Sequence, residues 1–227
     1  MDQSPYLLDT QITKRLCLPY LLALPDGYDE DPARQYPLIV SLHGAGERGD
    51  DLQALPLHGI PRIVREGPPM TPFPFITLCP QCAQDTTWRD HMDEVRALLD
   101  AAISEYRVDR SRIYLTGYSM GGSATWDWAA DEPERFAAIV PICGRGDPFH
   151  GFPYRVSALL KTPNWVFHGA LDDKVPLTES ATLVKILHDW GGNVRFTVYP
   201  YTAHDCWTET YANPDLYEWL LQHTRGR

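Results

Sequence analysis

The sequence predicts an α/β fold in which a mainly parallel sheet is flanked by helices. Short apolar runs alternate along the chain with segments of helical periodicity. Both alternating faces of these runs are apolar, as in strands buried between two layers of helices. A chain of 227 residues is long enough to bury a sizeable core, and no linker or repeat divides it. We therefore expect a single α/β domain over residues 1–227.

The expected strands are separated by enough chain for a helix or a long loop. Six runs are assigned to the parallel sheet: 38–42, 75–79, 112–116, 137–142, 165–168 and 195–199. An earlier run, 20–24, is followed by Pro25-Asp26-Gly27. This run is expected to form an antiparallel leading strand that ends in a turn.

Helices are expected where apolar residues recur every three or four positions. The segments with this spacing are 92–106, 178–190 and 215–222. Asp90 is the expected N-cap of the first helix. Six prolines in 50–74 limit any helix there to a short one. Residues 144–163 form a long connection, of the kind in which α/β proteins place ligands.

Charge and composition narrow the class of function. A net charge of −10 argues against nucleic acid or an anionic membrane surface as a partner. Residues 1–5 lack the basic start of a leader peptide, and the apolar run 16–24 is too short to span a bilayer. We expect a cytoplasmic protein, although a mature secreted form without its leader would have the same sequence.

Five cysteines, an odd number, favour free thiols over a disulfide framework. Cys79-Pro80-Gln81-Cys82 has the spacing of a redox or zinc motif, but no second ligand pair accompanies it. We interpret it as the end of a buried strand and expect no metal. Cys143 and Cys206 are expected to converge on one face, and a disulfide between them is left open.

The most informative segment is 117–122, Gly-Tyr-Ser-Met-Gly-Gly. It joins an apolar run to a helix-like segment, so the chain forms a strand, a sharp turn and a helix, with Ser119 at the turn. Gly117 and Gly121 let the strand and the helix approach closely. The hydroxyl then lies at a helix N-terminus, which favours negative charge. Ser119 is the candidate nucleophile, and an ordinary strand-to-helix turn is the alternative for the motif alone.

A serine nucleophile needs a base, and chain order narrows the choice. In this architecture the order is serine, acid, histidine. The histidines after the serine are His150, His168, His188, His204 and His223. His168 precedes any suitable acid, His188 lies within a helix, and His223 lies near the fraying terminus. His204, in the loop after the last strand, is the candidate base.

The acid is expected in the loop after the strand at 165–168. Asp172 is preferred over Asp173, because the neighbouring Lys174 suggests a solvated ion pair at Asp173. Asp205 is adjacent to His204 in sequence and is badly placed to reach its ring. Asp172 is therefore the candidate acid.

Two backbone amides are needed to bind an oxyanion. One is expected from Met120, immediately after the nucleophile. The other is expected from the loop 43–49, His-Gly-Ala-Gly-Glu-Arg-Gly, which follows a strand. Ala45 is the preferred donor and Gly44 the alternative. This loop lacks the Gly-Lys-Ser/Thr ending of a phosphate-binding loop.

These segments, in this order, resemble the α/β-hydrolase superfamily over about residues 20–221. The segments 43–49, 117–122 and 168–172 resemble those of compact carboxylesterases and predicted peptidases in the dienelactone hydrolase, phospholipase/carboxylesterase and feruloyl-esterase-like groups. The resemblance implies the α/β-hydrolase fold without a large lid domain, and cofactor-free hydrolysis of carboxylic esters.

The family patterns assign individual residues as well. The pattern His-Gly-x-x-Asp-x-x-Val-Pro places the acid on Asp172, and the closing His-Asp-x-Trp places the base on His204. The chain departs from the family at Arg145, where relatives often carry glycine. Trp88 and Trp207 are candidate pocket walls, with ordinary packing as an equal alternative.

The predicted function is that of a serine carboxylesterase for small or short-chain esters. An acyl thioesterase or lysophospholipase would need a long apolar channel, and 50–74 shows no apolar stripe for one. A serine peptidase usually has a domain that restricts access. A non-catalytic binding module would normally lack one of the three candidate catalytic residues. A small ester is the expected partner, without cofactor, nucleic acid or membrane, and the oligomeric state is left open.

Overall fold

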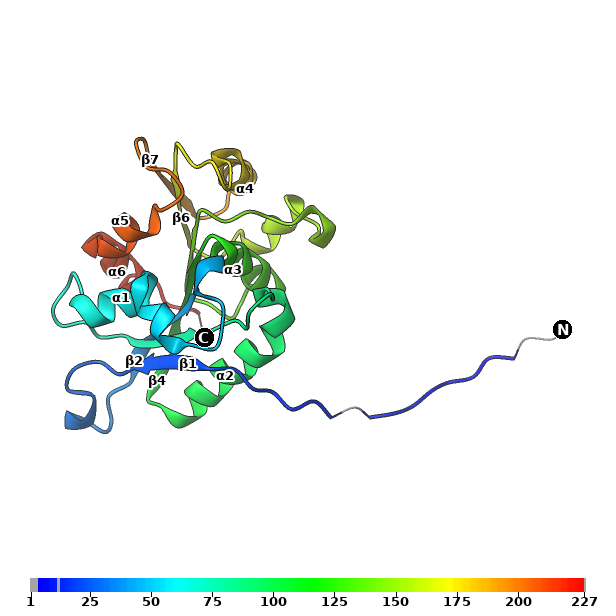
Figure 1. Ribbon diagram of the computed structural model, residues 1–227, viewed down its shortest axis with the longest axis horizontal. Helices are drawn as coiled ribbons and strands as arrows, with labels where there is room; N and C mark the ends of the chain where they lie inside the picture. Colours follow the sequence, from blue (N-terminus) through cyan, green and yellow to red (C-terminus); the bar gives the residue numbers. More distant parts are fainter. Residues whose placement is uncertain (1–3, 12, 227) are drawn as a thin grey trace.

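A seven-stranded sheet organises the computed structural model, which describes residues 4–11 and 13–226 (Figure 1). The strands are β1 (Tyr20–Ala23), β2 (Tyr36–Leu42), β3 (Ile76–Pro80), β4 (Val108–Tyr118), β5 (Ala138–Ile142), β6 (Asn164–Gly169) and β7 (Val194–Tyr199). Their order across the sheet is β1-β3-β2-β4-β5-β6-β7. Only the β1–β3 pair is antiparallel within this sheet. The predicted sheet and its antiparallel leading strand are confirmed.

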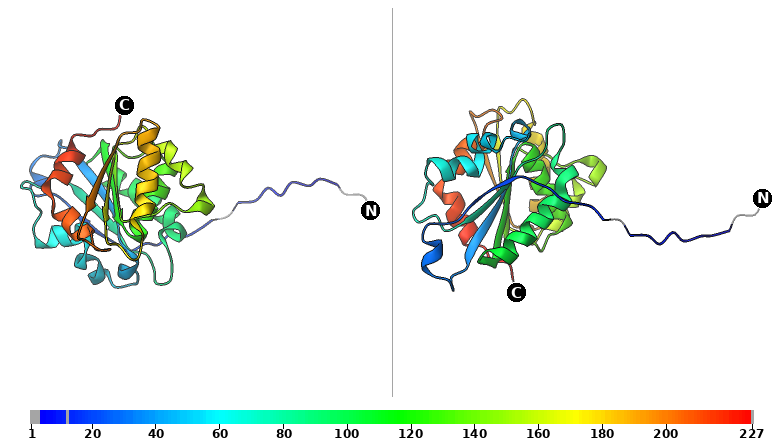
Figure 2. Two further views of the ribbon diagram at one scale, coloured as in Figure 1. Left: turned by 90° about the horizontal axis from the view of Figure 1, so that it is seen from above. Right: turned by 60° about the horizontal axis from the view of Figure 1, so that its bottom comes forward.

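Helices cover both faces of the sheet (Figure 2). They are α1 (Gly59–Glu66), α2 (Met92–Glu105), α3 (Met120–Asp131), α4 (Leu177–Asp189), α5 (Trp207–Ala212) and α6 (Pro214–Leu221). The apolar sides of α2, α3 and α4 bury residues such as Trp126 and Leu187 in one core. The other core receives Tyr211 and Leu220 from the layer of α1, α5 and α6. The structure is therefore a three-layer α/β arrangement, as predicted.

Burial of the strands follows their position in the sheet. The strands β2, β3, β5 and β6 are buried along their whole length. The prediction that 195–199 is buried on both faces is wrong, because every residue of β7 is exposed or half-buried. It is one of the two edge strands of the sheet, so it has a neighbouring strand on one side only.

Asp90 does not cap α2 as expected. A 3-10 turn, Trp88–His91, precedes the helix, and Asp90 belongs to this turn. The Asp90 carboxylate accepts hydrogen bonds from the backbone N–H and the hydroxyl of Thr87, at 2.8 and 2.9 Å. It reaches back three residues, so it stabilises the start of the turn and α2 continues from it.

The proline-containing segments fold as short turns. Residues 50–74 contain a 3-10 helix, Leu52–Leu57, and the eight-residue α1, which confirms that helices there are short. The connection 144–163 holds two 3-10 helices, Pro148–His150 and Tyr154–Leu159. In the described part of the chain, no helix has the length and apolar character needed to cross a bilayer. Residues 1–3, which bear on the leader expectation, lie outside the described part.

Candidate active site

Ser119 occupies a strained turn between β4 and α3. Its φ and ψ are 54° and −115°, a conformation that side chains rarely adopt. The turn is possible because two glycines permit close backbone contact. A Cβ on Gly121 would lie 2.0 Å from the carbonyl oxygen of Leu42, and one on Gly117 would lie 2.4 Å from that of Gly121. The hydroxyl of Ser119 is thereby held at the end of β4.

Three residues from three loops form one hydrogen-bonded chain. Nε2 of His204 lies 2.8 Å from Oγ of Ser119, and Nδ1 of the same ring lies 2.7 Å from Oδ2 of Asp172. Because an ionised carboxylate only accepts, Nδ1–H donates to Asp172 and Nε2 accepts the hydroxyl proton of Ser119. This is the tautomer that a general base needs. The structure thus joins the three residues selected from the sequence.

The environment of Asp172 keeps it ionised. Burial opposes ionisation, but the hydrogen bond from His204 and two backbone amides outweigh it and hold the pKa of Asp172 below its usual value. These amides, from Lys174 and Val175, donate to Oδ1 at 2.9 Å. The side chain is fully buried, whereas that of Asp173 is 72% exposed. Asp172 therefore makes the contact that Asp173 cannot make.

His168 supports Asp172 from behind, a role that sequence reasoning missed. Its Nε2 lies 2.8 Å from the carbonyl oxygen of Val175 and 3.2 Å from Oδ2 of Asp172, so Nε2 carries a proton. Nδ1 then accepts from the hydroxyl of Ser180 at 2.8 Å. Burial lowers the pKa of His168 and favours the neutral ring. In the sequence, the role of His168 could be inferred only from Ser180, the fourth residue of the helix that follows. A serine near the start of a helix is too common to indicate such a contact.

The loop 43–49 is held by two buried aromatic side chains. Nε2 of His43 accepts the N–H of Cys82 at 2.9 Å, and Nδ1 donates to the carbonyl oxygen of Gly44. The indole N–H of Trp88 donates to the carbonyl oxygen of His43 at 2.9 Å. Ala45 follows at the exposed start of a 3-10 turn, at the same edge of the sheet as Ser119. The loop is thus anchored next to the candidate nucleophile.

This anchoring makes the stability of the protein depend on pH. Burial lowers the pKa of His43 to about 4, whereas an unfolded histidine takes up its proton near 6.5. Between these values the unfolded state binds more protons, so the free energy of unfolding falls as the pH is lowered from 6.5 to 4. We expect His43 to account for a loss on the order of 3 kcal/mol, measured by denaturant unfolding across this pH range.

The His43→Asn variant removes the titrating ring and should reduce this dependence by the share of His43, leaving the part that comes from groups such as His168, whose pKa is also lowered by burial. His188→Asn is the matched control, because the side chain of His188 is 81% exposed on α4. An unfolding free energy of the wild type that stays constant from pH 6.5 to 4.5 would contradict the prediction.

The two candidate wall tryptophans lie in different places. Trp88 lines the cavity at Ser119, although only 1% of its surface is exposed. Trp207, at the start of α5, packs edge-on against the ring of His204 with centroids 5.4 Å apart, and it stacks on Tyr118. The edge-on contact packs the indole against the ring of His204. Trp207 is absent from the described residues that line that cavity.

The cysteines of the described chain are free thiols. Cys79 lies in β3 and Cys82 two residues after its end, and both are buried, which confirms the interpretation as the end of a buried strand. Burial raises the pKa of both thiols to about 12. Cys143 and Cys206 are buried in the same core and lie close to each other. The sulfur of Cys143 and ligand atoms of Asp172 and His204 lie within 4.8 Å of one another. Burial raises the pKa of the Cys143 thiol.

A cavity of about 410 Å³ opens beside the hydrogen-bonded chain. Ser119, Met120 and His204 lie in its wall. Much of the remaining lining is polar or charged, including Thr87, Arg89, Ser123, Asp127, Arg145, Asp147 and Lys174. A substrate bound here would contact the serine hydroxyl, the base and the amide at the start of α3.

Comparison with known proteins identifies the protein family of the chain. The model of the phospholipase/carboxylesterase family matches residues 30–214. The chain belongs to this family. It is therefore a member of an esterase family with the α/β-hydrolase fold, in agreement with the predicted fold and class.

Individual relatives of this esterase-family chain match a shorter part of it than the family model does. A bifunctional acetylxylan esterase/xylanase, XynS20E of Neocallimastix patriciarum, is 29% identical over 119 residues, which cover 48% of the chain and 16% of the relative. "Probable feruloyl esterase C" of Aspergillus terreus is 29% identical over 133 residues, 55% of the chain and 46% of the relative. The match thus spans less than half the length of both relatives.

A solved structure covers more of the esterase-family chain. The crystal structure of a thermostable esterase is 35% identical and superposes with a TM-score of 0.77. The superposition covers 92% of this chain and 60% of that one. No large lid is seen in the described part of the chain, and the α/β-hydrolase prediction is confirmed.

Proposed function

We propose that this protein is a serine carboxylesterase that hydrolyses small or short-chain carboxylic esters through an acyl-enzyme intermediate. The observation that carries the proposal is the hydrogen-bonded chain Asp172–His204–Ser119 at the wall of a 410 Å³ cavity. The family membership of the chain supports the same class of reaction.

In the first half of the reaction, Oγ of Ser119 attacks the ester carbonyl. Nε2 of His204 accepts the hydroxyl proton, and the Asp172 carboxylate stabilises the imidazolium that forms. We assign the oxyanion to the backbone N–H groups of Met120 and Ala45. Removing one such donor typically costs about 3 kcal/mol of transition-state stabilisation. His204 then returns its proton to the alcohol, which leaves as the tetrahedral intermediate collapses.

In the second half, water hydrolyses the acyl-Ser119 ester. His204 removes a proton from the water, and the same two amides stabilise the second oxyanion. Proton return to Oγ of Ser119 releases the carboxylic acid and regenerates the enzyme. The chain uses only its own side chains and backbone for these steps.

We expect the enzyme to prefer short acyl groups. Polar and charged groups make up more than half of the cavity lining, so a long acyl chain would find only part of its length covered by apolar surface there. Each buried methylene would contribute about 0.8 kcal/mol, and methylenes left in water contribute little. The kcat/KM for p-nitrophenyl esters should therefore peak between acetate and butyrate and fall about fivefold or more by octanoate.

The same screen tests the proposed function and its alternatives. Methyl ferulate and an acyl-CoA are assayed beside the p-nitrophenyl series, because relatives include feruloyl esterases and thioesters share the mechanism. A maximum at decanoate or longer, or activity only above the micellar concentration, would indicate a lipase or lysophospholipase. Preference for the acyl-CoA would indicate a thioesterase. Folded protein without activity on any of these esters would overturn the proposal.

A further inference from the structure

Cations gather in the lining of the candidate active-site cavity of this strongly acidic protein. Its lining includes three cations, Arg89, Arg145 and Lys174, but only two carboxylates, Asp127 and Asp147. The whole chain has a net charge of −10. The lining is therefore richer in cations than the chain as a whole, and the position of each cation shows which one is available to a ligand.

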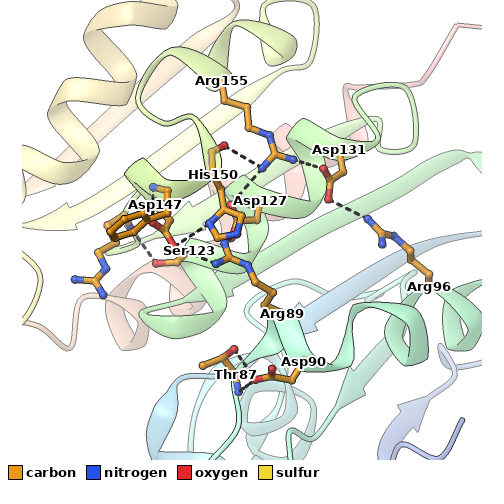
Figure 3. A network of polar contacts seen from close by, with 12 residues as sticks. Thr87, Arg89, Asp90, Arg96, Ser123, Asp127, Asp131, Asp147, His150 and Arg155 are labelled. Atoms are coloured by element: carbon orange, nitrogen blue, oxygen red, sulfur yellow. Dashed lines mark hydrogen bonds and ion pairs between the residues drawn. The ribbon is translucent and has the colours of Figure 1, made fainter. Parts of the chain in front are cut away.

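Arg89 is already neutralised by both carboxylates. Figure 3 shows its guanidinium between Asp127 and Asp147. One nitrogen lies 2.7 Å from Asp127 and another lies 3.0 Å from Asp147. A neighbouring cavity of about 350 Å³ shares Arg89, Ala124 and Asp127. The ion pairs of Arg89 with Asp127 and Asp147 thus separate the two cavities. Because both carboxylates already neutralise Arg89, it is not available to bind an anionic ligand.

Arg145 has a fixed backbone and an uncommitted side chain. Its N–H donates to the hydroxyl of Ser123 at 3.0 Å, which ties it to the first turn of α3. The preceding Gly144 packs so tightly there that a Cβ would lie 2.4 Å from the backbone of Gly122. Among the described residues, no carboxylate lies within ion-pair distance of the Arg145 guanidinium. Arg145 is therefore a free cation in the cavity wall, beside the helix that begins after Ser119.

Lys174 is anchored to the other side of the proposed machinery. Its backbone N–H donates to Oδ1 of Asp172 at 2.9 Å. Its ammonium contacts only Asp173 among the described residues, at 3.3 Å, in a pair in which both side chains are more than two-thirds exposed. Such exposed pairs contribute little and exchange readily for another anion. Lys174 can therefore add to the field of Arg145 at the cavity.

We propose that Arg145, assisted by Lys174, forms an anion subsite and that the preferred substrate is an ester carrying a second, free carboxylate. The inference rests on the proposed esterase function. The guanidinium of arginine binds a planar carboxylate through two parallel hydrogen bonds. An ester with this group would be held at Arg145 while its scissile carbonyl lies at Ser119.

The test compares matched esters that differ only by the carboxylate. Phenyl hydrogen adipate and phenyl hexanoate form the acyl-side pair, because shorter half-esters cyclise and hydrolyse unaided. The butyrate ester of 3-hydroxybenzoate and phenyl butyrate form the alcohol-side pair. The quantity measured is the ratio of kcat/KM for the charged ester to that for the neutral one, at low and at high salt.

Arg145→Gln should lower this ratio for one of the two pairs by about tenfold, the contribution of one charge-assisted hydrogen bond. The affected pair identifies whether the subsite serves the acyl or the alcohol part. Lys174→Gln should give a smaller decrease of about threefold, because its ammonium is already paired with Asp173 and is exposed to solvent. High salt should reduce the wild-type ratio in the same direction. Arg110→Gln is the control, since this exposed arginine lies near the start of β4, at the opposite end from Ser119.

The outcomes separate the subsite from the underlying function. If the wild type hydrolyses the neutral esters but the ratio is equal in the wild type and Arg145→Gln, the anion subsite is overturned and the esterase function stands. An equal decrease in Arg110→Gln would also overturn it, because the effect would then come from net charge. If the folded wild type hydrolyses no ester of either pair, the proposed function fails and the subsite fails with it.

Discussion

Ser119→Ala is expected to lower kcat for ester hydrolysis by about four to six orders of magnitude, the range seen when a serine nucleophile is removed. The reason is geometric. Oγ of Ser119 is the atom within 2.8 Å of the base, and no other part of the side chain takes part in the chemistry. The change deletes one oxygen, so the melting temperature should stay close to that of the wild type. Steady-state kinetics on p-nitrophenyl butyrate measure the effect.

Ser104→Ala provides the matched control, because this serine is exposed on α2. It should retain wild-type kcat. A fluorophosphonate probe should label the wild type and Ser104→Ala at the peptide containing Ser119, and should not label Ser119→Ala. Retention of more than a few per cent of activity in a folded Ser119→Ala protein would exclude this serine as the nucleophile.

Asp172→Asn is expected to lower kcat by about three to four orders of magnitude. The oxygen of the new side-chain amide can still accept from the two backbone N–H groups, which favours retention of the local fold. The NH₂ group of that amide would then face Nδ1 of His204 and would hold the ring in the wrong tautomer. Nε2 would carry the proton and could not accept one from Ser119. Steady-state kinetics with a parallel melting curve test this expectation.

Asp173→Asn isolates the effect of position from that of charge. It removes the same negative charge one residue away, from a side chain that is 72% exposed. Its kcat should change less than threefold, in line with the small contribution of exposed ion pairs. A larger loss in Asp173→Asn than in Asp172→Asn would mean that the adjacent carboxylate orients His204.

Much of the architecture was predictable because it depends on local pattern. Strands buried on both faces leave continuous apolar runs, so β2, β3, β5 and β6 were found within two residues of their ends. The turn at Ser119 was predictable because only glycine tolerates the contacts at positions 117 and 121. Chain order then selected Asp172 and His204. Their catalytic roles stay predictions, while their hydrogen bonds are features of the structure.

Other features depend on contacts between distant segments and left no local signal. The six residues of α5 are too few to show a helical period, and the exposure of β7 depends on its place at the sheet edge. The burial of His168 behind Asp172 requires α4 to pack against β6.

No local pattern in a chain of net charge −10 predicted that cations would gather in the cavity lining. Folding pairs Arg89 with two carboxylates and leaves Arg145 without one among the described residues. The fold and the order of the candidate catalytic groups could be derived from the sequence, since both follow from short-range pattern. Which charges meet could be known only from the folded chain, because ion pairing depends on distances between segments far apart in sequence.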